Sequence, residues 1–199
     1  MFVIFILGGT SSGKTTFARR LKDKISGSAL ISQDNYHKDM SHLTRVELSS
    51  HNFDKPDSLN LDDLAKDIIT LSENGSVMIP HYDFKEQIST KNQIEVKKPK
   101  VLIVEGLFLV QNELLNNLSD FNVFIDIDSD VRLSRRILRD VKERGDTVEE
   151  IIERYLKYVK VGHDKFIQPQ IDECQIIVKE KKFDEKLDFV YRYIKDAVS

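Results

Sequence analysis

The sequence lacks the residue patterns of disulfide-linked, zinc-binding and GTP-switch proteins. It has one cysteine, Cys174, which excludes an intrachain disulfide framework and agrees with a reducing compartment. The five histidines are scattered, and none pairs with cysteines at metal-ligand spacing, so a zinc site is not expected. The N-K-x-D and D-x-x-G elements of GTPase switches are also missing from the chain.

The sequence also lacks a large excess of one charge and a long apolar run. The formal net charge is −3 with 32% charged residues, so a general polyanion-binding surface and a nucleic-acid partner are not expected. The apolar run from Phe2 to Leu7 is far too short to span a bilayer, and no basic segment precedes it as in a signal peptide. We therefore expect a cytoplasmic protein with no membrane partner.

A phosphate-binding loop follows this first apolar run. It fits the pattern G-x-x-x-x-G-K-[ST] and consists of Gly8, Gly9, Thr10, Ser11, Ser12, Gly13, Lys14, Thr15 and Thr16. Glycines let such a loop wrap a polyphosphate, while Lys14 reaches the β- and γ-phosphates and Thr15 holds Mg²⁺. The β-branched residues before it predict a strand, and the apolar spacing after it predicts a helix. The loop therefore predicts a nucleoside triphosphate as ligand.

Strand-like apolar runs alternate with helical stretches along the 199 residues. We expect strands over residues 2–7, 29–31, 101–104, 122–127 and 175–178. We expect helices over residues 14–24, 61–73, 113–118, 129–143, 148–167 and 184–198. Because the strands are almost continuously hydrophobic, they suit a parallel sheet covered by helices on both faces. The pattern predicts an α/β fold of the phosphate-loop NTPase type.

One segment breaks this alternation. Residues 77–84 and 94–96 flank a polar stretch and predict an inserted β-hairpin at about 77–96, attached to the main sheet. A hairpin of this kind fits a second-substrate pocket and a plain structural flap equally well. Since the length suits one domain and no linker is required, we expect a single domain over residues 1–199.

Two acids follow strand-like runs. Glu105 ends the run 101–104 and precedes Gly106, which places one carboxylate beside the expected Mg²⁺ and argues against a hydrolase with paired acids. Asp34 follows the run 29–31 at the sheet edge where ligands collect. It is a candidate to orient an attacking hydroxyl, and on these residues alone an ordinary turn aspartate is an equal alternative.

An arginine stripe is the second strongest signal. Four arginines at helical positions i, i+3, i+4 and i+7 share one face, and they are Arg132, Arg135, Arg136 and Arg139. Arg144 extends the stripe into a glycine-containing connection, so residues at about 132–147 predict an arginine-rich lid. Closing such a lid would bring positive charge to the transferred phosphate and exclude water. A solvated basic face is the plainer alternative.

Taken in order, these segments resemble the uridine kinase family, or uridine–cytidine kinases, of the phosphate-loop kinases. The resemblance runs from about residue 5 to 178. Besides the loop, it includes the segments Asn52-Phe53-Asp54-Lys55-Pro56-Asp57, Pro80-His81-Tyr82-Asp83-Phe84, Glu105-Gly106 and Arg132 to Asp140. It implies phosphorylation of a ribonucleoside 5′-hydroxyl by ATP or GTP with Mg²⁺, in an enzyme that is usually a tetramer.

Residue by residue, the resemblance implies roles for both sides of the site. Asp34 matches the acid that orients the 5′-hydroxyl, and Thr15, Glu105 and Asp34 match the Mg²⁺ environment. Asp54 matches the acid that holds ribose hydroxyls, and Tyr82 and Phe84 match aromatics of the nucleoside pocket. The matched lid arginines, which serve phosphates and substrate, are Arg136, Arg139 and Arg144.

The sequence departs from the family pattern around the base. Gln87 replaces a common histidine, His37 replaces an aromatic residue, Asp146 replaces a lid arginine and Arg154 replaces a glutamine. Gln87, His37 and Arg154 are still expected to face the substrate, and Gln87 can donate and accept hydrogen bonds at a pyrimidine edge. Two alternatives therefore stay open: a related kinase of nicotinamide riboside or pantothenate, and a non-catalytic nucleotide-binding regulator.

Overall fold

The fold is centred on a parallel β-sheet. The computed structural model describes residues 1–44, 47, 51–83 and 88–199. Five strands are hydrogen-bonded in the order β2-β5-β1-β6-β7, and every neighbouring pair is parallel. They are β1 (Phe2–Gly8), β2 (Ser28–Ser32), β5 (Val101–Gly106), β6 (Phe121–Ile125) and β7 (Ile176–Val178). The expected strands and the parallel α/β class are confirmed.

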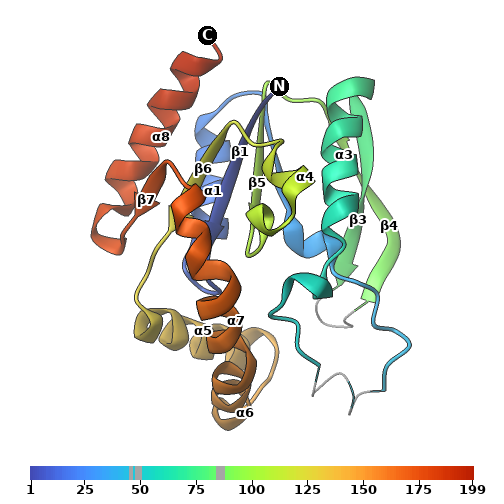
Figure 1. Ribbon diagram of the computed structural model, residues 1–199, viewed down its shortest axis with the longest axis vertical. Helices are drawn as coiled ribbons and strands as arrows, with labels where there is room; N and C mark the ends of the chain where they lie inside the picture. The colour runs from blue at the N-terminus through green and yellow to red at the C-terminus, as the bar shows by residue number, and fades with distance from the viewer. Residues whose placement is uncertain (45–46, 48–50, 84–87) are drawn as a thin grey trace.

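Helices surround this sheet (Figure 1). The α-helices are α1 (Lys14–Lys24), α3 (Leu61–Asn74), α4 (Glu113–Asn116), α5 (Ser129–Glu143), α6 (Val148–Arg154), α7 (Lys160–Gly162) and α8 (Phe183–Ala197). Two π-helical stretches, Tyr155–Val159 and His163–Ile167, join α6 and α7 into one continuous helical segment over 148–167, the range that the sequence predicted. Short 3-10 turns lie at Gln33–Tyr36, Pro56–Ser58, Leu109–Gln111, Gln168–Glu173 and Glu180–Lys182.

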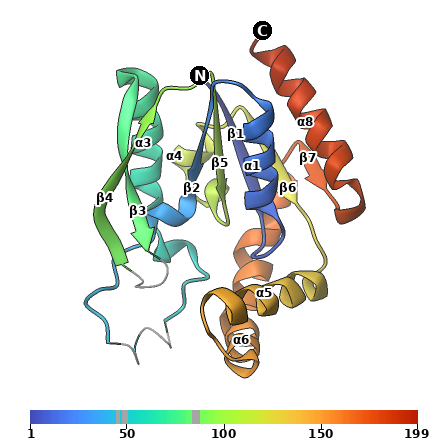
Figure 2. The same cartoon turned by 180° about the vertical axis from the view of Figure 1, so that it is seen from behind.

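The alternation of side chains along β1 divides the apolar core into two layers. Val3, Phe5 and Leu7 pack on one face with the apolar residues of α3 and α4. Ile4 and Ile6 pack on the other face with those of α1 and α8, the two helices seen in front of the sheet in Figure 2. Since both faces are covered, the central strands carry apolar residues at almost every position.

The expected hairpin is present, but its extent and attachment differ from the prediction. β3 (Ser76–Asp83) and β4 (Ile88–Lys97) pair antiparallel in a two-stranded sheet of their own. Val77, Ile79 and Val96 pack into the same apolar layer as α3, so the hairpin is anchored to this helix. The second strand begins at Ile88 because polar residues expected in the connection pair with β3 instead.

The carboxyl ends of the sheet strands face a separate group of helices. α5, α6 and α7 lie beyond this end, whereas both chain termini lie at the opposite end (Figure 1). The phosphate-binding loop leaves β1 at the same end, since it directly follows Gly8. This arrangement places the loop between the sheet and the helices that carry the arginine stripe.

The core makes a direct stability prediction. Phe5 is fully buried in the central strand, so Phe5→Ala should lower the free energy of unfolding by about 3–5 kcal/mol through lost burial and the cavity it leaves. Phe189 on α8 is 43% exposed, and Phe189→Ala is the matched control, with an expected change within about 0.5 kcal/mol. Urea unfolding measures both. Equal losses in the two variants would contradict the placement of Phe5.

Candidate functional site

The phosphate-binding loop has the local structure that its sequence predicts. It joins β1 to α1, which begins at Lys14. The backbone has positive φ at Gly8 (144°), Ser11 (57°) and Gly13 (95°), so the chain curls sharply between strand and helix. Lys14 is only 9% exposed. A cation held in a curled backbone at a helix N-terminus is suited to bind an anion.

Glu105 lies directly beside this loop. It is 2% exposed at the end of β5, and its carboxylate accepts hydrogen bonds from Ser32 Oγ at 2.6 Å and Thr15 Oγ1 at 3.2 Å. Burial raises the pKa of Glu105, while the charge of Lys14 opposes this rise and that of Asp34 adds to it. The structure therefore brings Thr15, Glu105 and Lys14 together, as the sequence predicts.

Asp34 lies on the 3-10 turn that follows β2, the strand next to β5. Ser32 pairs in register with Glu105, so Asp34 and Glu105 both lie at the same edge of the sheet. The Asp34 amide donates to Ser32 Oγ at 3.3 Å, which fixes the start of this turn. Gln33 is 1% exposed, and its Oε1 accepts a hydrogen bond from the Phe108 amide at 3.0 Å. The turn that carries Asp34 is thus fastened to the segment after Glu105.

A third acid, Asp54, lies among cationic groups on the other side of the site. Burial raises the pKa of Asp54, and the charges of Arg136, His37, Arg144 and Arg154 oppose the rise. The His37 ring lies 5.1 Å from the Tyr82 ring, centroid to centroid. Burial also lowers the pKa of His37. Asp54, His37 and Tyr82 therefore share one region, whereas Phe84 and Gln87 lie outside the described residues.

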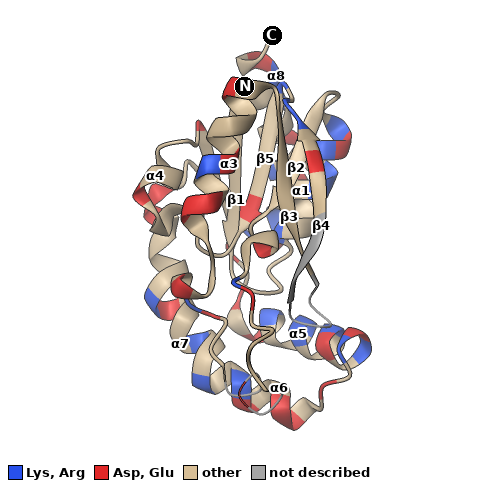
Figure 3. Ribbon diagram, turned by 90° about the vertical axis from the view of Figure 1, so that its right-hand side faces the viewer, with Lys and Arg blue, Asp and Glu red and all other residues tan. Residues whose placement is uncertain are grey.

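The arginine stripe on α5 faces inward, and the apolar side of this helix faces outward. Arg132 and Arg136 are 4% and 5% exposed, whereas Leu138 is 74% exposed. Arg136 Nη1 donates to Thr10 Oγ1 of the phosphate-binding loop at 3.3 Å. Arg135 is the exception among the four arginines, because it turns to Glu180. Figure 3 shows acidic and basic residues interspersed over α5, α6 and α7.

Asp140 lies beside two of these arginines and Arg144. Arg139 Nε lies 2.8 Å from its carboxylate, Arg136 Nε 3.2 Å and Arg144 Nε 3.5 Å. We refer to Arg136, Arg139 and Arg144 around Asp140 as the arginine cluster. Asp140 is fully buried, and sequence reasoning gave it no role. Its spacing of four residues from both Arg136 and Arg144 was a usable helical signal.

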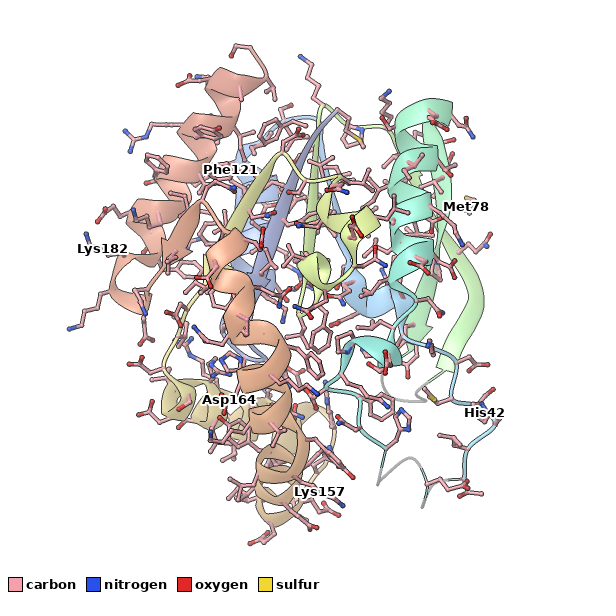
Figure 4. The ribbon with its side chains drawn as sticks, viewed as in Figure 1. His42, Met78, Phe121, Lys157, Asp164 and Lys182 are labelled. Carbon is pink, nitrogen blue, oxygen red and sulfur yellow. The ribbon has the colours of Figure 1, made fainter. Side chains whose placement is uncertain are left out.

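The segment 148–167 contributes contacts that the sequence did not predict. His163 of this segment and Arg132 of α5 are both over nine-tenths buried. They lie so close to Gly9 that a Cβ there would be 3.0 Å from His163 Nδ1 and 2.6 Å from Arg132 Nη1. On the same segment, a Cβ at Gly162 would lie 2.2 Å from the Asp54 carbonyl oxygen. Figure 4 shows the segment with its side chains, where Lys157 and Asp164 are labelled. One helical segment therefore contacts both the phosphate-binding loop and Asp54.

The two departures at Asp146 and Arg154 form a pair. Arg154 Nη1 donates to Asp146 Oδ2 at 3.1 Å, between the connection after α5 and the end of α6. The acid at 146 thus binds the cation at 154. The charge of Arg154 also acts on Asp54, so these two predicted site residues lie in the same region.

Over residues 1–44, 47, 51–83 and 88–199, no helix is both long and apolar enough to cross a bilayer. Within the same ranges, His, Cys, Asp and Glu side chains do not gather in groups of three or more as for a metal ion.

Comparisons with known proteins agree with this geometry. The model of the phosphoribulokinase/uridine kinase family matches residues 3–185. The uridine kinase of Clostridium novyi is 41% identical over 180 residues, which cover 89% of this chain and 86% of that protein. The uridine kinase of Chlamydia pneumoniae is 42% identical over 180 residues, which cover 89% of this chain and 81% of that protein.

Solved structures show the same fold at lower identity. Phosphoribulokinase from Rhodobacter spheroides superposes with a TM-score of 0.64 at 16% identity, covering 89% of this chain and 70% of that one. D-glycerate 3-kinase from Cryptococcus neoformans var. grubii gives a TM-score of 0.60 at 19% identity, covering 90% and 86%.

The contact between Gly162 and Asp54 can be tested by adding one methyl group. Gly162→Ala should lower the free energy of unfolding by about 1–3 kcal/mol, because the new Cβ overlaps the Asp54 carbonyl. A loss of stability would be informative, because alanine in a helix is otherwise favoured over glycine by about 1 kcal/mol. Val161→Ala, at the 57% exposed neighbour, is the control with little expected change. Chemical denaturation that finds Gly162→Ala equally or more stable would contradict this contact.

Proposed function

Because the chain belongs to the phosphoribulokinase/uridine kinase family, we propose that it phosphorylates the 5′-hydroxyl of uridine or cytidine with ATP or GTP as donor. It is a phosphotransferase with a hydroxyl acceptor. The observation that carries the proposal is the identity of 41% with a uridine kinase over 89% of this chain. The position of Asp34 next to Glu105 and the phosphate-binding loop supports it.

On the donor side, we propose that the loop from Gly8 to Thr16 binds the triphosphate through its amides and Lys14. The oxygens of Thr15 and Glu105 lie together at the end of β5 and are the hard ligands that Mg²⁺ prefers, so they fit this ion. Asp34, next to them, would add charge at the same place. When bound, Mg²⁺ neutralises charge that develops on the phosphates.

On the acceptor side, we propose that Asp34 orients the 5′-hydroxyl toward the γ-phosphorus. The new bond joins the 5′-oxygen to this phosphorus, and the bond to the β,γ-bridging oxygen of the donor breaks to leave the nucleoside diphosphate. The hydroxyl proton passes to Asp34 late in the transfer, because a carboxylate is a weak base. Orientation is therefore its main contribution.

The nucleoside is proposed to lie between the hairpin and the helical segment 148–167. Asp54 binds the ribose hydroxyls, and Tyr82 and His37 flank the ring system on the hairpin side. Phe84, Gln87 and Arg154 complete the proposed pocket, and Arg136, Arg139 and Arg144 serve the phosphates. The position of the partly buried Asp54 among cations supports its role, since a carboxylate there can accept two hydroxyl hydrogen bonds.

The remaining parts of the proposal rest on the family resemblance. We propose that residues 1–199 form a single kinase domain, that residues 132–147 act as a lid, and that the enzyme is a cytoplasmic tetramer. Its partners are the nucleoside triphosphate and the nucleoside, without nucleic acid or a membrane.

An acceptor panel tests the proposed function. With Mg²⁺ and ATP or GTP, release of nucleoside diphosphate should require uridine or cytidine and should be at least about tenfold slower with purine nucleosides, nicotinamide riboside or pantothenate. Coupled spectrophotometric assays measure each rate, and mass spectrometry identifies the 5′-monophosphate. Turnover with a non-nucleoside alone would overturn the proposal, and tight ATP binding without any turnover would favour a regulator.

The role of Asp34 makes a separate prediction. Asp34→Asn should lower kcat by about 10²- to 10⁴-fold, because the amide cannot accept the proton of the hydroxyl that it orients. ATP affinity, measured by calorimetry, should stay within about threefold, since the loop from Gly8 to Thr16 is unchanged. Asp23→Asn, at an exposed position of α1, is the matched control with unchanged kcat. An unaffected rate in Asp34→Asn would remove Asp34 from this role.

A further inference from the structure

A fully buried carboxylate lies at the centre of the arginine cluster. Asp140 has 0% exposure, and three guanidinium groups from its own helix and the residue after it approach this one side chain. A buried charge is costly to desolvate unless partners compensate for it. Burial alone would raise the pKa of Asp140, but the hydrogen bond from Arg139 and the charges of Arg144 and Arg136 outweigh burial and hold the pKa below its ordinary value. Asp140 is therefore ionised at neutral pH.

The arginines approach Asp140 by one particular edge. The closest contact of Arg136, Arg139 and Arg144 to the carboxylate is in each case through Nε, the nitrogen nearest the side-chain stem. The Nη1 and Nη2 atoms of a guanidinium form the opposite end, which is the end that binds phosphate oxygens as a fork. Arg136 shows the direction of this end, because its Nη1 donates to Thr10 Oγ1 in the phosphate-binding loop.

The cluster also holds like charges close together. Arg136 is itself 5% exposed, and burial lowers its pKa, against the charges of Asp54 and Asp140. Repulsion between neighbouring guanidinium groups is several-fold stronger in a partly buried site than in water. The negative charge of Asp140 offsets this repulsion. The side chains of Arg139 and Arg144 are 33% and 39% exposed, so they have room to turn toward solvent.

We propose that Asp140 is a positioning residue for phosphoryl transfer, which holds Arg136, Arg139 and Arg144 by their Nε edges and directs their Nη ends to the phosphates. It contacts no substrate and exchanges no proton. Arginines that are already oriented need no reorganisation when charge develops on the transferred group, which is the main source of electrostatic catalysis. This inference rests on the proposed function of the same site.

Asp140→Asn tests the proposal, because the amide keeps the size of the side chain and removes its charge. We expect kcat to fall at least about tenfold, as for other groups that orient a reacting constellation, while the KM for the nucleoside changes less than about threefold. Asp196→Asn, at an exposed position of α8, is the matched control with unchanged kinetics. An Asp140→Asn protein that is folded by circular dichroism and has unchanged kcat would overturn the proposal.

A binding measurement separates this proposal from the proposed function. Calorimetry with Mg²⁺ and inorganic triphosphate needs no acceptor, so it reports on the arginines even if the acceptor assignment is wrong. We expect affinity to fall about three- to tenfold in Asp140→Asn, because the cluster no longer presents its Nη ends together. Tighter binding would overturn the proposal, since it would mean that Asp140 competes with phosphate for the arginines.

A second variant covers the case in which Asp140→Asn does not fold. Arg139→Lys keeps the positive charge at a one-third exposed side chain but removes the Nε that contacts Asp140. We expect a fall in kcat of at least about tenfold, because the lysine ammonium cannot make the same directed contact with Asp140. An unchanged kcat in Arg139→Lys would overturn the proposal by itself.

Discussion

The parallel pairing of β2, β5 and β1 is the constraint on which the functional site depends. Since parallel strands point the same way, their carboxyl ends meet at one sheet edge. The register pairs Ser32 with Glu105 and Leu7 with Gly106, so the turn with Asp34 and the loop from Gly8 leave the sheet on either side of Glu105. A slip of one residue would move each side chain of a strand to the opposite face and separate these groups.

Buried charge is concentrated at this edge of the sheet. For this reason α5 turns its charged face inward and its apolar face outward, the reverse of an ordinary surface helix. Amphipathic helices usually turn their apolar stripe to the core, yet Leu138 is 74% exposed while Asp140 is fully buried. The inward face of α5 meets the phosphate-binding loop rather than an apolar layer, so polar contacts replace apolar burial there. Such a violation of binary patterning is expected where a helix serves a site rather than the core.

Local sequence patterns predicted much of this fold, and contacts distant in sequence explain the rest. The bounds of α1 and α5 agree with the periodicity of their own residues, and the glycine pattern predicted the loop between β1 and α1. The extent of β4 was predicted wrongly, because its polar residues form a strand only through pairing with β3. The proximity of His163 to Gly9 joins residues more than 150 positions apart, which no periodicity reports. The burial of Asp140 depended on which face of α5 meets the loop, and helical spacing alone does not decide this.

The helical segment 148–167 restricts movement around the proposed site. Gly162 contacts the Asp54 backbone, and His163 lies against Gly9, so a rigid movement of the whole segment would disturb both sides of the site together. The connection between α5 and α6 turns at Gly145, which has a φ of 76°. The amides of Arg144 and Asp146 both lie within hydrogen-bonding distance of the Asp140 carbonyl, which fastens the start of this connection to the arginine cluster. The carboxylate and the carbonyl of Asp140 therefore both contact Arg144, so the arginine cluster and the segment 148–167 hold the site from two directions.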